Sequence, residues 1–184
     1  MDNQVLETIA ARSSIRAYRK EPIESDKIEA LKAAALASPT AMNRQDQRFV
    51  FITDKEVISQ IDNAVFADII KKHNEGMIDR IVKRGGKALH GSPLLVCIFA
   101  KPSHFAGVDA GIAIENIVLA AKSMGLDSCI LGMPIVAFDP ENGYGLASFL
   151  GVPDGFEFMI AAAIGYRAEE KAPHEVNEQH IIEV

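Results

Sequence analysis

The sequence centres on a continuous apolar run, Pro93-Leu94-Leu95-Val96-Cys97-Ile98-Phe99-Ala100, with turn-forming residues on each side. A strand that is covered on both faces carries apolar residues without the alternation of a half-exposed strand. The run therefore predicts a central strand that is buried on both faces. Such a strand needs further strands beside it and helices over the resulting sheet.

Three other segments have the composition of strands. Phe49-Val50-Phe51-Ile52 is short, aromatic and β-branched, which favours a buried strand. Two further strands are expected over residues 128–133 and 156–164, which are also rich in apolar residues. The predicted strands are spread along the chain and are not joined by close hairpin turns.

Helices are expected between these strands, because apolar residues recur there at helical spacing. One short helix carries Val5, Leu6 and Ile9. A second is expected to begin at the N-cap Ser25 and to stop before Pro39. The others are expected from a capping box at Thr53-Asp54-Lys55-Glu56, over residues 63–83 with a break at Gly76 and an end at Gly85-Gly86, and over residues 142–150.

The segment from Asp109 to Met124 is apolar around nearly its whole circumference, and Gly125 follows it. A glycine directly after a helix is typical of the left-handed residue that ends it. A helix without a polar face is expected in the core and not on the surface. Glu115 and Asn116 are conspicuous inside such a helix.

These elements predict an α+β fold in which helices cover a mixed sheet. With 184 residues, the chain fits a single domain over residues 1–184. The alternative is a doubly wound parallel fold. It is weakened by the absence of a G-x-G-x-x-G turn after an early strand, which dinucleotide-binding folds use to approach a pyrophosphate.

Composition argues against several partners. The chain has a formal net charge of −6 and a pI near 5.4, so nucleic acid is not an expected partner. Charges interrupt every apolar stretch before the roughly 18 residues of a membrane span, and no signal-peptide pattern opens the chain. Cys97 and Cys129 are far apart, which favours reduced thiols and a cytoplasmic location. The five histidines form no H-x-x-x-H pair, so no metal site is expected.

The run Arg12-Ser13-Ser14-Ile15-Arg16 follows the first predicted helix and brings two guanidinium groups and two hydroxyls together. Arginine offers paired, permanently charged donors, and serine adds neutral donors, so such a loop can surround a phosphate monoester. A solvated basic loop that pairs with surface acids has the same composition. The spacing alone leaves both interpretations open.

A second irregular segment, Pro39-Thr40-Ala41-Met42-Asn43-Arg44-Gln45, precedes the predicted strand at Phe49. Carboxamides both donate and accept hydrogen bonds, and small residues let backbone amides come close to a ligand. The segment therefore suits a planar heteroaromatic ring with alternating donors and acceptors. An ordinary structured loop is the alternative.

Taken together, these segments resemble the nitroreductase family of FMN-dependent oxidoreductases. The resemblance spans nearly the whole chain, because its motifs occur in the family's order and spacing. They are the loop from Arg12 to Tyr18, the segment from Ser38 to Gln45, the helix from Asp109 to Asn116, the run from Gly125 to Gly132, and Ala163-Ile164-Gly165-Tyr166.

The resemblance implies a mixed, mostly antiparallel central sheet flanked by helices. It also implies an intertwined homodimer with FMN at the subunit interface. Arg12 would hold the FMN phosphate together with Ser13 and Ser14, and Arg16 would lie towards the pyrimidine side of the flavin. A further cation near the C-terminus would grip the phosphate. The candidates for it are Arg167 and Lys171, of which Lys171 is favoured.

The resemblance also implies the residues around the flavin ring. Pro39, Thr40, Ala41, Asn43 and Gln45 would bind the cofactor, with Thr40, Ala41 and Asn43 supplied by the partner subunit. The backbone of Leu131 and Gly132 would face flavin N5 and O4. Arg16, Leu131 and Gly132 are thus the residues expected to act in catalysis.

The activity implied is transfer of hydride from NADH or NADPH, through flavin N5, to an electron-poor acceptor such as a nitroaromatic, a quinone or a flavin.

The sequence departs from the family pattern in two places that affect the substrate pocket. The family's Gln-Pro-Trp reads Gln45-Asp46-Gln47 here, and only His180–Val184 remains for a swapped C-terminal strand. The alternative function is a flavin- or ligand-binding dimer that keeps the scaffold without reductase turnover.

Overall fold

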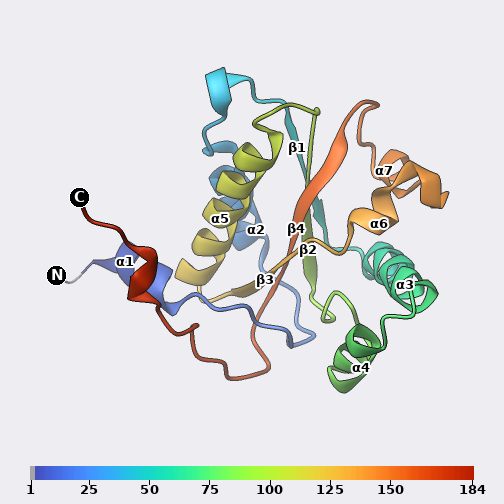
Figure 1. Ribbon diagram of the computed structural model, residues 1–184, viewed down its shortest axis with the longest axis horizontal. Coiled ribbons are helices and arrows are strands. Elements are labelled where there is room, and N and C mark those ends of the chain that lie inside the picture. The colour runs from blue at the N-terminus through green and yellow to red at the C-terminus, as the bar shows by residue number, and fades with distance from the viewer. Residues whose placement is uncertain (1–2) are drawn as a thin grey trace.

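The computed structural model describes residues 3–184 and has a four-stranded sheet at its centre (Figure 1). The strands are β1 (Gln47–Ile52), β2 (Leu94–Ala100), β3 (Asp127–Leu131) and β4 (Glu157–Gly165). Their order across the sheet is β1-β2-β4-β3, and all three neighbouring pairs are antiparallel. These antiparallel pairs exclude the doubly wound parallel fold that was the alternative. The only parallel pairing among the described residues is an isolated bridge between Ser14 and Ser128.

The apolar run that begins at Pro93 forms the central strand β2, and every residue of β2 is buried. Because successive side chains point to opposite faces of a sheet, Leu95, Cys97 and Phe99 enter one core and Leu94, Val96 and Ile98 the other. Two apolar cores thus lie on the two sides of the sheet, as the uninterrupted run predicts.

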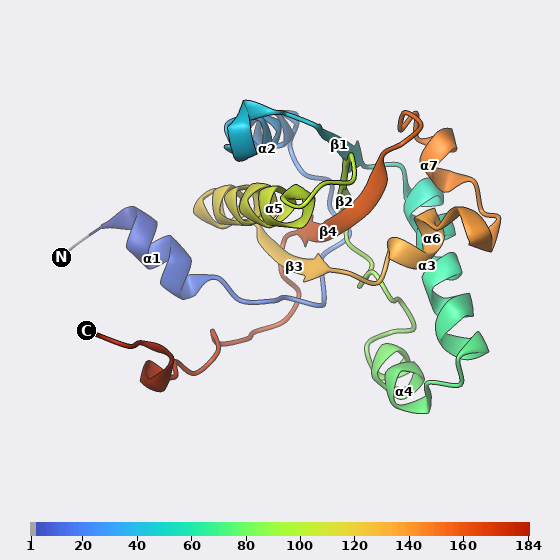
Figure 2. The same cartoon turned by 45° about the horizontal axis from the view of Figure 1, so that its top comes forward.

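One face of the sheet is covered by α2 (Ser25–Leu36) and α5 (Ala106–Ser123), as Figures 1 and 2 show. α5 ends as expected, with Gly125 at a φ of +78°. The expectation that α5 lies wholly in the core needs correction, because Val108 is 58% exposed and Ile112 39% exposed. Within one chain, α5 therefore presents an apolar strip to solvent.

Further helices lie on the other side of the sheet (Figures 1 and 2). They are α3 (Lys55–Lys71), α4 (Glu75–Lys83), α6 (Ile135–Phe138) and α7 (Leu146–Phe149). The remaining helical elements are α1 (Gln4–Ala11), η1 (Ala41–Asn43), η2 (Pro140–Asn142) and η3 (Glu178–His180). α3 and α4 enclose a small third core between them.

Several predicted helix ends are wrong, and each has a local cause. Ser25 is the first helical residue and Glu24 the N-cap. Asp54, not Thr53, caps α3, because its carboxylate accepts from the backbone N–H groups of Glu56 and Val57. The helix expected over 63–83 breaks at residues 72–74 and not at Gly76, because Asn74 caps a new helix. The helix expected over 142–150 is reduced to α7.

The segment after α1 is fastened to the strands at the edge of the sheet. The Ser14–Ser128 bridge ties it to β3, and an antiparallel bridge joins Tyr18 to Arg167 just after β4. The buried Tyr18 hydroxyl lies 2.7 Å from the carbonyl oxygen of Ile15 and 3.0 Å from that of Ala163. The loop that precedes Tyr18 therefore has a fixed place on the sheet.

Candidate functional site

The loop from Arg12 to Arg16 carries the first group of predicted site residues, and a buried residue orients it. Ile15 is fully buried, and its N–H donates to the Ser128 carbonyl at 2.9 Å. In an extended segment, neighbouring side chains point away from each other. Arg16 therefore faces away from the core that holds Ile15.

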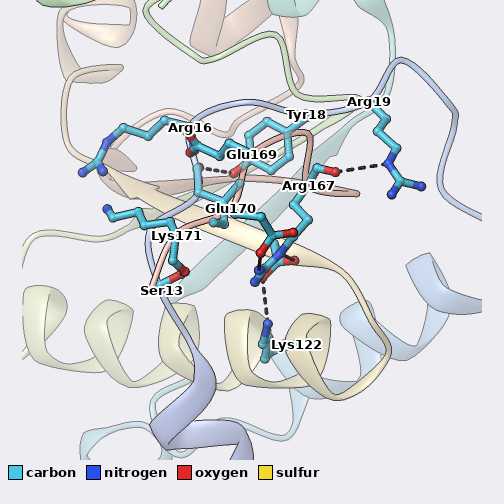
Figure 3. Close-up of polar contacts among 11 residues, drawn as sticks. Ser13, Arg16, Tyr18, Arg19, Lys122, Arg167, Glu169, Glu170 and Lys171 are labelled. Carbon is cyan, nitrogen blue, oxygen red and sulfur yellow. Dashed lines mark hydrogen bonds and ion pairs between the residues drawn. The ribbon is translucent and has the colours of Figure 1, made fainter. Parts of the chain in front are cut away.

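Arg16 and Lys171 converge on one backbone atom of this loop. Arg16 Nη1 donates to the Ser14 carbonyl oxygen at 3.2 Å, and Lys171 Nζ donates to the same oxygen at 2.9 Å. The Ser13 hydroxyl donates to the Lys171 carbonyl at 3.3 Å. Figure 3 shows the side chains of Arg16 and Lys171 extending to the same side of the loop. The structure thus brings together residues more than 150 positions apart in sequence.

Arg12 forms an ion pair with Glu115 of α5, with 3.5 Å between Nε and Oε1. The side chain of Arg12 is 22% exposed and that of Glu115 44% exposed. Such partly exposed pairs contribute little stability, so the guanidinium of Arg12 remains available to a more strongly charged ligand. Glu115, conspicuous in the sequence, is thus placed beside the phosphate candidate. Asn116, equally conspicuous, donates to the hydroxyl of Ser38 at 3.0 Å.

The two C-terminal phosphate candidates differ in their surroundings. Arg167 binds the buried Asp127 through Nε and Nη2 at 2.7 and 2.8 Å, and Lys122 binds the same carboxylate at 3.0 Å. Burial alone raises the pKa of Asp127, but the hydrogen bonds from Arg167 and Lys122 lower it overall. In Figure 3, Arg167 extends towards Lys122 and away from the side where Lys171 lies. This geometry favours Lys171 over Arg167 as the ligand-facing cation.

Sequence reasoning missed two further groups beside the loop. The Glu169 carboxylate accepts from the backbone N–H of Arg16. His90 is only 9% exposed, has a φ of +62°, and has no hydrogen-bond partner for Nδ1 among residues 3–184. No local motif signals either residue, because their partners lie far along the chain.

Two pKa shifts show that positive charge is concentrated here. Burial, together with the charges of Arg16 and Arg84, lowers the pKa of His90 to about 4. Burial raises the pKa of Cys129, whereas Arg16, Lys171 and Arg84 act in the opposite direction. Arg16 of the loop, Lys171 after β4 and Arg84 at the end of α4 therefore all place positive charge near His90 or Cys129.

The donor set of this region fits the phosphate of FMN. Arg12, Arg16 and Lys171 supply three positive charges, and the acids in contact with the loop are Glu115 and Glu169. The hydroxyl of Ser14 adds a neutral donor, whereas the Ser13 hydroxyl donates to the Lys171 carbonyl in this structure. A phosphate monoester is close to doubly charged and is bound best by charged donors combined with such neutral ones.

The segment from Pro39 to Gln45 lies elsewhere in the chain, beyond the start of α5 at the top of Figure 1. The Ala41 N–H donates to both oxygens of Asp109 at 3.1 and 3.2 Å. Met42, Asn43 and Gln45 all have φ values near +52°, a conformation that costs energy in residues with side chains. Within one chain, the structure does not bring this segment to Arg12 and Arg16.

Leu131 and Gly132 lie where β3 ends, before α6. Leu131 is 4% exposed, whereas a Cβ added at Gly132 would meet no atom within 4 Å. The parallel bridge at Ser128 directs the loop along β3, so Arg16 lies towards the end of the strand that carries these two residues. Leu131 and Gly132 thus offer backbone groups at the edge of open space.

Comparison with known proteins identifies the family of this chain. The family model described as "Nitroreductase family" matches residues 9–166, so the chain belongs to the nitroreductase family. Two similar solved structures are nitroreductases with bound FMN. One is from Desulfitobacterium hafniense (29% identity, 100% of both chains, TM-score 0.93), and the other is from Bacteroides fragilis (27%, 100% of both, 0.87). An NADPH-flavin oxidoreductase of Vibrio harveyi is 30% identical over 166 residues, covering 89% of this chain and 66% of that protein.

Among the helices of residues 3–184, none is long and apolar enough to cross a membrane. Within the same residues, His, Cys, Asp and Glu side chains form no group of three or more that is able to hold a metal ion.

Proposed function

We propose that the protein is an FMN-dependent oxidoreductase that passes hydride from NADH or NADPH to a small electron-poor acceptor. The observation that carries the proposal is the convergence of Arg16 and Lys171 on the Ser14 carbonyl, with Arg12 in the same loop. The nitroreductases from D. hafniense and B. fragilis bind FMN, and the relative from V. harveyi is a flavin oxidoreductase that uses NADPH.

In this proposal, the phosphate is held by the residues of the loop. Arg12 exchanges its weak pairing with Glu115 for the phosphate, and the hydroxyls of Ser13 and Ser14 occupy further phosphate oxygens. Lys171 adds a charge from the other end of the chain. Arg167 serves to fix that segment through Asp127, which keeps Lys171 beside the loop.

The reacting part of the site is assigned to Arg16, Leu131 and Gly132. FMN, when bound, supplies the ability to accept a hydride and to give it to a second molecule. Arg16 places positive charge beside the ring and favours the negative charge that reduction adds. The backbone of Leu131 and Gly132 orients the ring edge, and the open space at Gly132 leaves room for it. No side chain acts as a nucleophile.

The complete site requires a homodimer. In this proposal, Pro39, Thr40, Ala41, Asn43 and Gln45 reach the flavin from the partner subunit, which accounts for their distance from the Arg12 loop within one chain. α1 supports this assembly, because it buries none of its residues and leaves Val5, Leu6 and Ile9 at least half exposed. The exposed strip of α5 adds to that apolar surface.

The C-terminal segment also suits an intertwined dimer. Ile181, Ile182 and Val184 are all more than 70% exposed, and the C-terminal segment lies on the same side of the molecule as α1 (Figures 1 and 2). β1 is an edge strand of the sheet, and an edge strand has unpaired backbone groups that can accept another strand. The segment His180–Val184 is the candidate for such pairing in the partner.

The test has two steps. The first identifies the bound chromophore, and the second measures turnover by the protein. The purified protein, reconstituted with flavin where necessary, should release FMN at one molecule per chain by mass spectrometry. It should also oxidise NADH or NADPH with a nitroaromatic, a quinone or free flavin as acceptor. FAD, or no flavin after reconstitution, would refute the proposal. Bound FMN that no nicotinamide reduces would support the second candidate, a flavin-binding dimer without turnover.

A further inference from the structure

A second cavity lies between the first turns of α3 and the loop that leads into β2. Its volume is about 240 Å³. Lys55, Ile58, Ser59 and Asp62 line it from one side of α3, where residues three and four apart lie on the same face. None of the residues proposed to bind FMN lines this cavity.

The cavity walls are positively charged in a chain that is negative overall. Lys20, Lys55 and Lys87 are part of the lining, and Asp62 is the acidic residue among them. The lining therefore has a formal charge of +2 (three lysines minus one aspartate), whereas the chain carries −6. A concave site with charge of one sign raises the local concentration of oppositely charged ligands.

Two of these three lysines have no acidic partner in the part of the chain that the structure describes. Within residues 3–184, Lys20 and Lys55 form no ion pair, and Lys87 Nζ lies 3.9 Å from Asp62 Oδ2. Asp62 is 4% exposed, and its other oxygen accepts from the Leu89 N–H at 2.7 Å. Its carboxylate is thus engaged by the loop, which leaves two of the lysines without an acidic partner.

A buried hydroxyl in the same wall has no partner. Ser92 is 5% exposed, and its Oγ forms no hydrogen bond with any of residues 3–184. Buried polar groups in proteins are nearly always hydrogen-bonded, so an orphan hydroxyl in a cavity wall indicates a missing partner. The Ser92 Oγ is a neutral donor and acceptor among charged donors.

The remaining wall is apolar. Ile58, Leu89 and Pro93 contribute to the lining. A volume of about 240 Å³ is smaller than the roughly 300–1,000 Å³ of sites for drug-sized ligands. The cavity therefore suits a small molecule that has a charged end and a compact apolar body.

We propose that this cavity is a second binding site, specific for a small organic anion with a carboxylate or phosphate group on an apolar body. Lys20, Lys55 and Lys87 neutralise the anion, and the Ser92 hydroxyl donates a hydrogen bond to it. The apolar body packs against Ile58, Leu89 and Pro93. The site is separate from the one proposed for FMN, because the two share no lining residue.

The test is a binding titration of the purified, flavin-loaded protein, followed by NMR of its backbone amides. The probes are inorganic phosphate and cyclohexanecarboxylate, whose ring is not planar and is therefore poorly suited to stacking on a flavin. Cyclohexylmethanol is the neutral control. We expect saturable binding of cyclohexanecarboxylate, with shifts at Leu89 and Ser92, weaker binding of phosphate, and none of the alcohol.

Variants decide whether the cavity itself binds. Ser92→Ala and Lys55→Gln should each weaken binding at least fivefold, whereas Lys83→Gln, an exposed lysine on α4 outside the lining, should leave it within twofold. Equal binding by all variants, shifts confined to the Arg12 loop, or no saturation would overturn the proposal. A protein that fails to bind FMN but still binds the carboxylate at Ser92 would leave the second site standing while the proposed function fails.

Discussion

Arg12 and Arg16 lie four positions apart, yet the structure gives them different surroundings. Arg12 faces α5 and pairs with Glu115, whereas Arg16 shares the Ser14 carbonyl with Lys171. If Arg12 grips the phosphate, Arg12→Ala should weaken FMN binding by about 2–5 kcal/mol, the cost of leaving a buried charge unpaired. The reduction potential of the FMN that remains should be unchanged.

Arg16→Ala should instead change the reduction potential of the bound FMN. Removing a positive charge beside the ring disfavours the negative charge that reduction adds, so the two-electron potential should fall. Reductive titration against a reference dye, with FMN binding measured by fluorescence, separates the two variants. Arg80→Ala, on the exposed side of α4, is the matched control. An unchanged potential in Arg16→Ala would remove Arg16 from the reacting part of the site.

His90 should contribute to the pH dependence of the protein's stability. Burial, together with the charges of Arg16 and Arg84, lowers its pKa from 6.5 to about 4 in the folded protein. Between these values the unfolded chain binds more protons than the folded one, so stability is highest above pH 6.5 and falls as the pH drops towards 4. Urea unfolding across this range should show the loss, and His90→Gln should reduce it. If the free energy of unfolding depends on pH equally in the unmodified protein and in His90→Gln, His90 is not the source of the loss.

At the residue scale, the sequence singled out the Arg12 loop and offered Lys171 and Arg167 as candidate cations, but it did not indicate the partners of these residues. The spacing of Arg12 and Arg16 is local and can be recognised in one segment. Glu169 and His90 act through contacts with Arg16 or its charge, and such contacts depend on how distant segments meet. No periodicity or motif contains that information.

At the scale of elements, β2 and α5 were predictable because each has a strong and continuous hydrophobic pattern. Helix ends were less predictable, because several neighbouring residues compete to form the cap. Thr53 and Asp54 are both good caps by residue type, and the structure selects Asp54. The short helices α6 and α7, of four residues each, carry too little pattern to be placed from sequence.

The cap of α3 allows a direct check. Asp54→Ala removes the acceptor for the N–H groups of Glu56 and Val57 and should lower the free energy of unfolding by about 1 kcal/mol. Thr53→Ala is the control, because Thr53 lies outside the helix and makes no capping bond. Chemical denaturation of the two variants tests this, and a larger loss in Thr53→Ala would restore the capping box suggested by the sequence.

At the scale of the whole molecule, one chain carries apolar surface that a second chain would cover. Light scattering at low micromolar concentration should therefore give twice the mass of the 20.0 kDa chain. Ile9→Asp, on the exposed face of α1, should weaken the dimer and FMN retention together if the site is shared. The exposed Lys83→Gln is again the control. A stable monomer that still holds FMN would rule out the shared site.

The central claim is that this chain uses bound FMN to pass hydride from a nicotinamide to an acceptor. The most direct test is anaerobic titration of the FMN-loaded protein with NADH and with NADPH, followed by its visible spectrum. One equivalent of at least one nicotinamide should bleach the flavin absorbance, and a nitroaromatic or a quinone should restore it. A flavin spectrum that neither nicotinamide changes would contradict the claim.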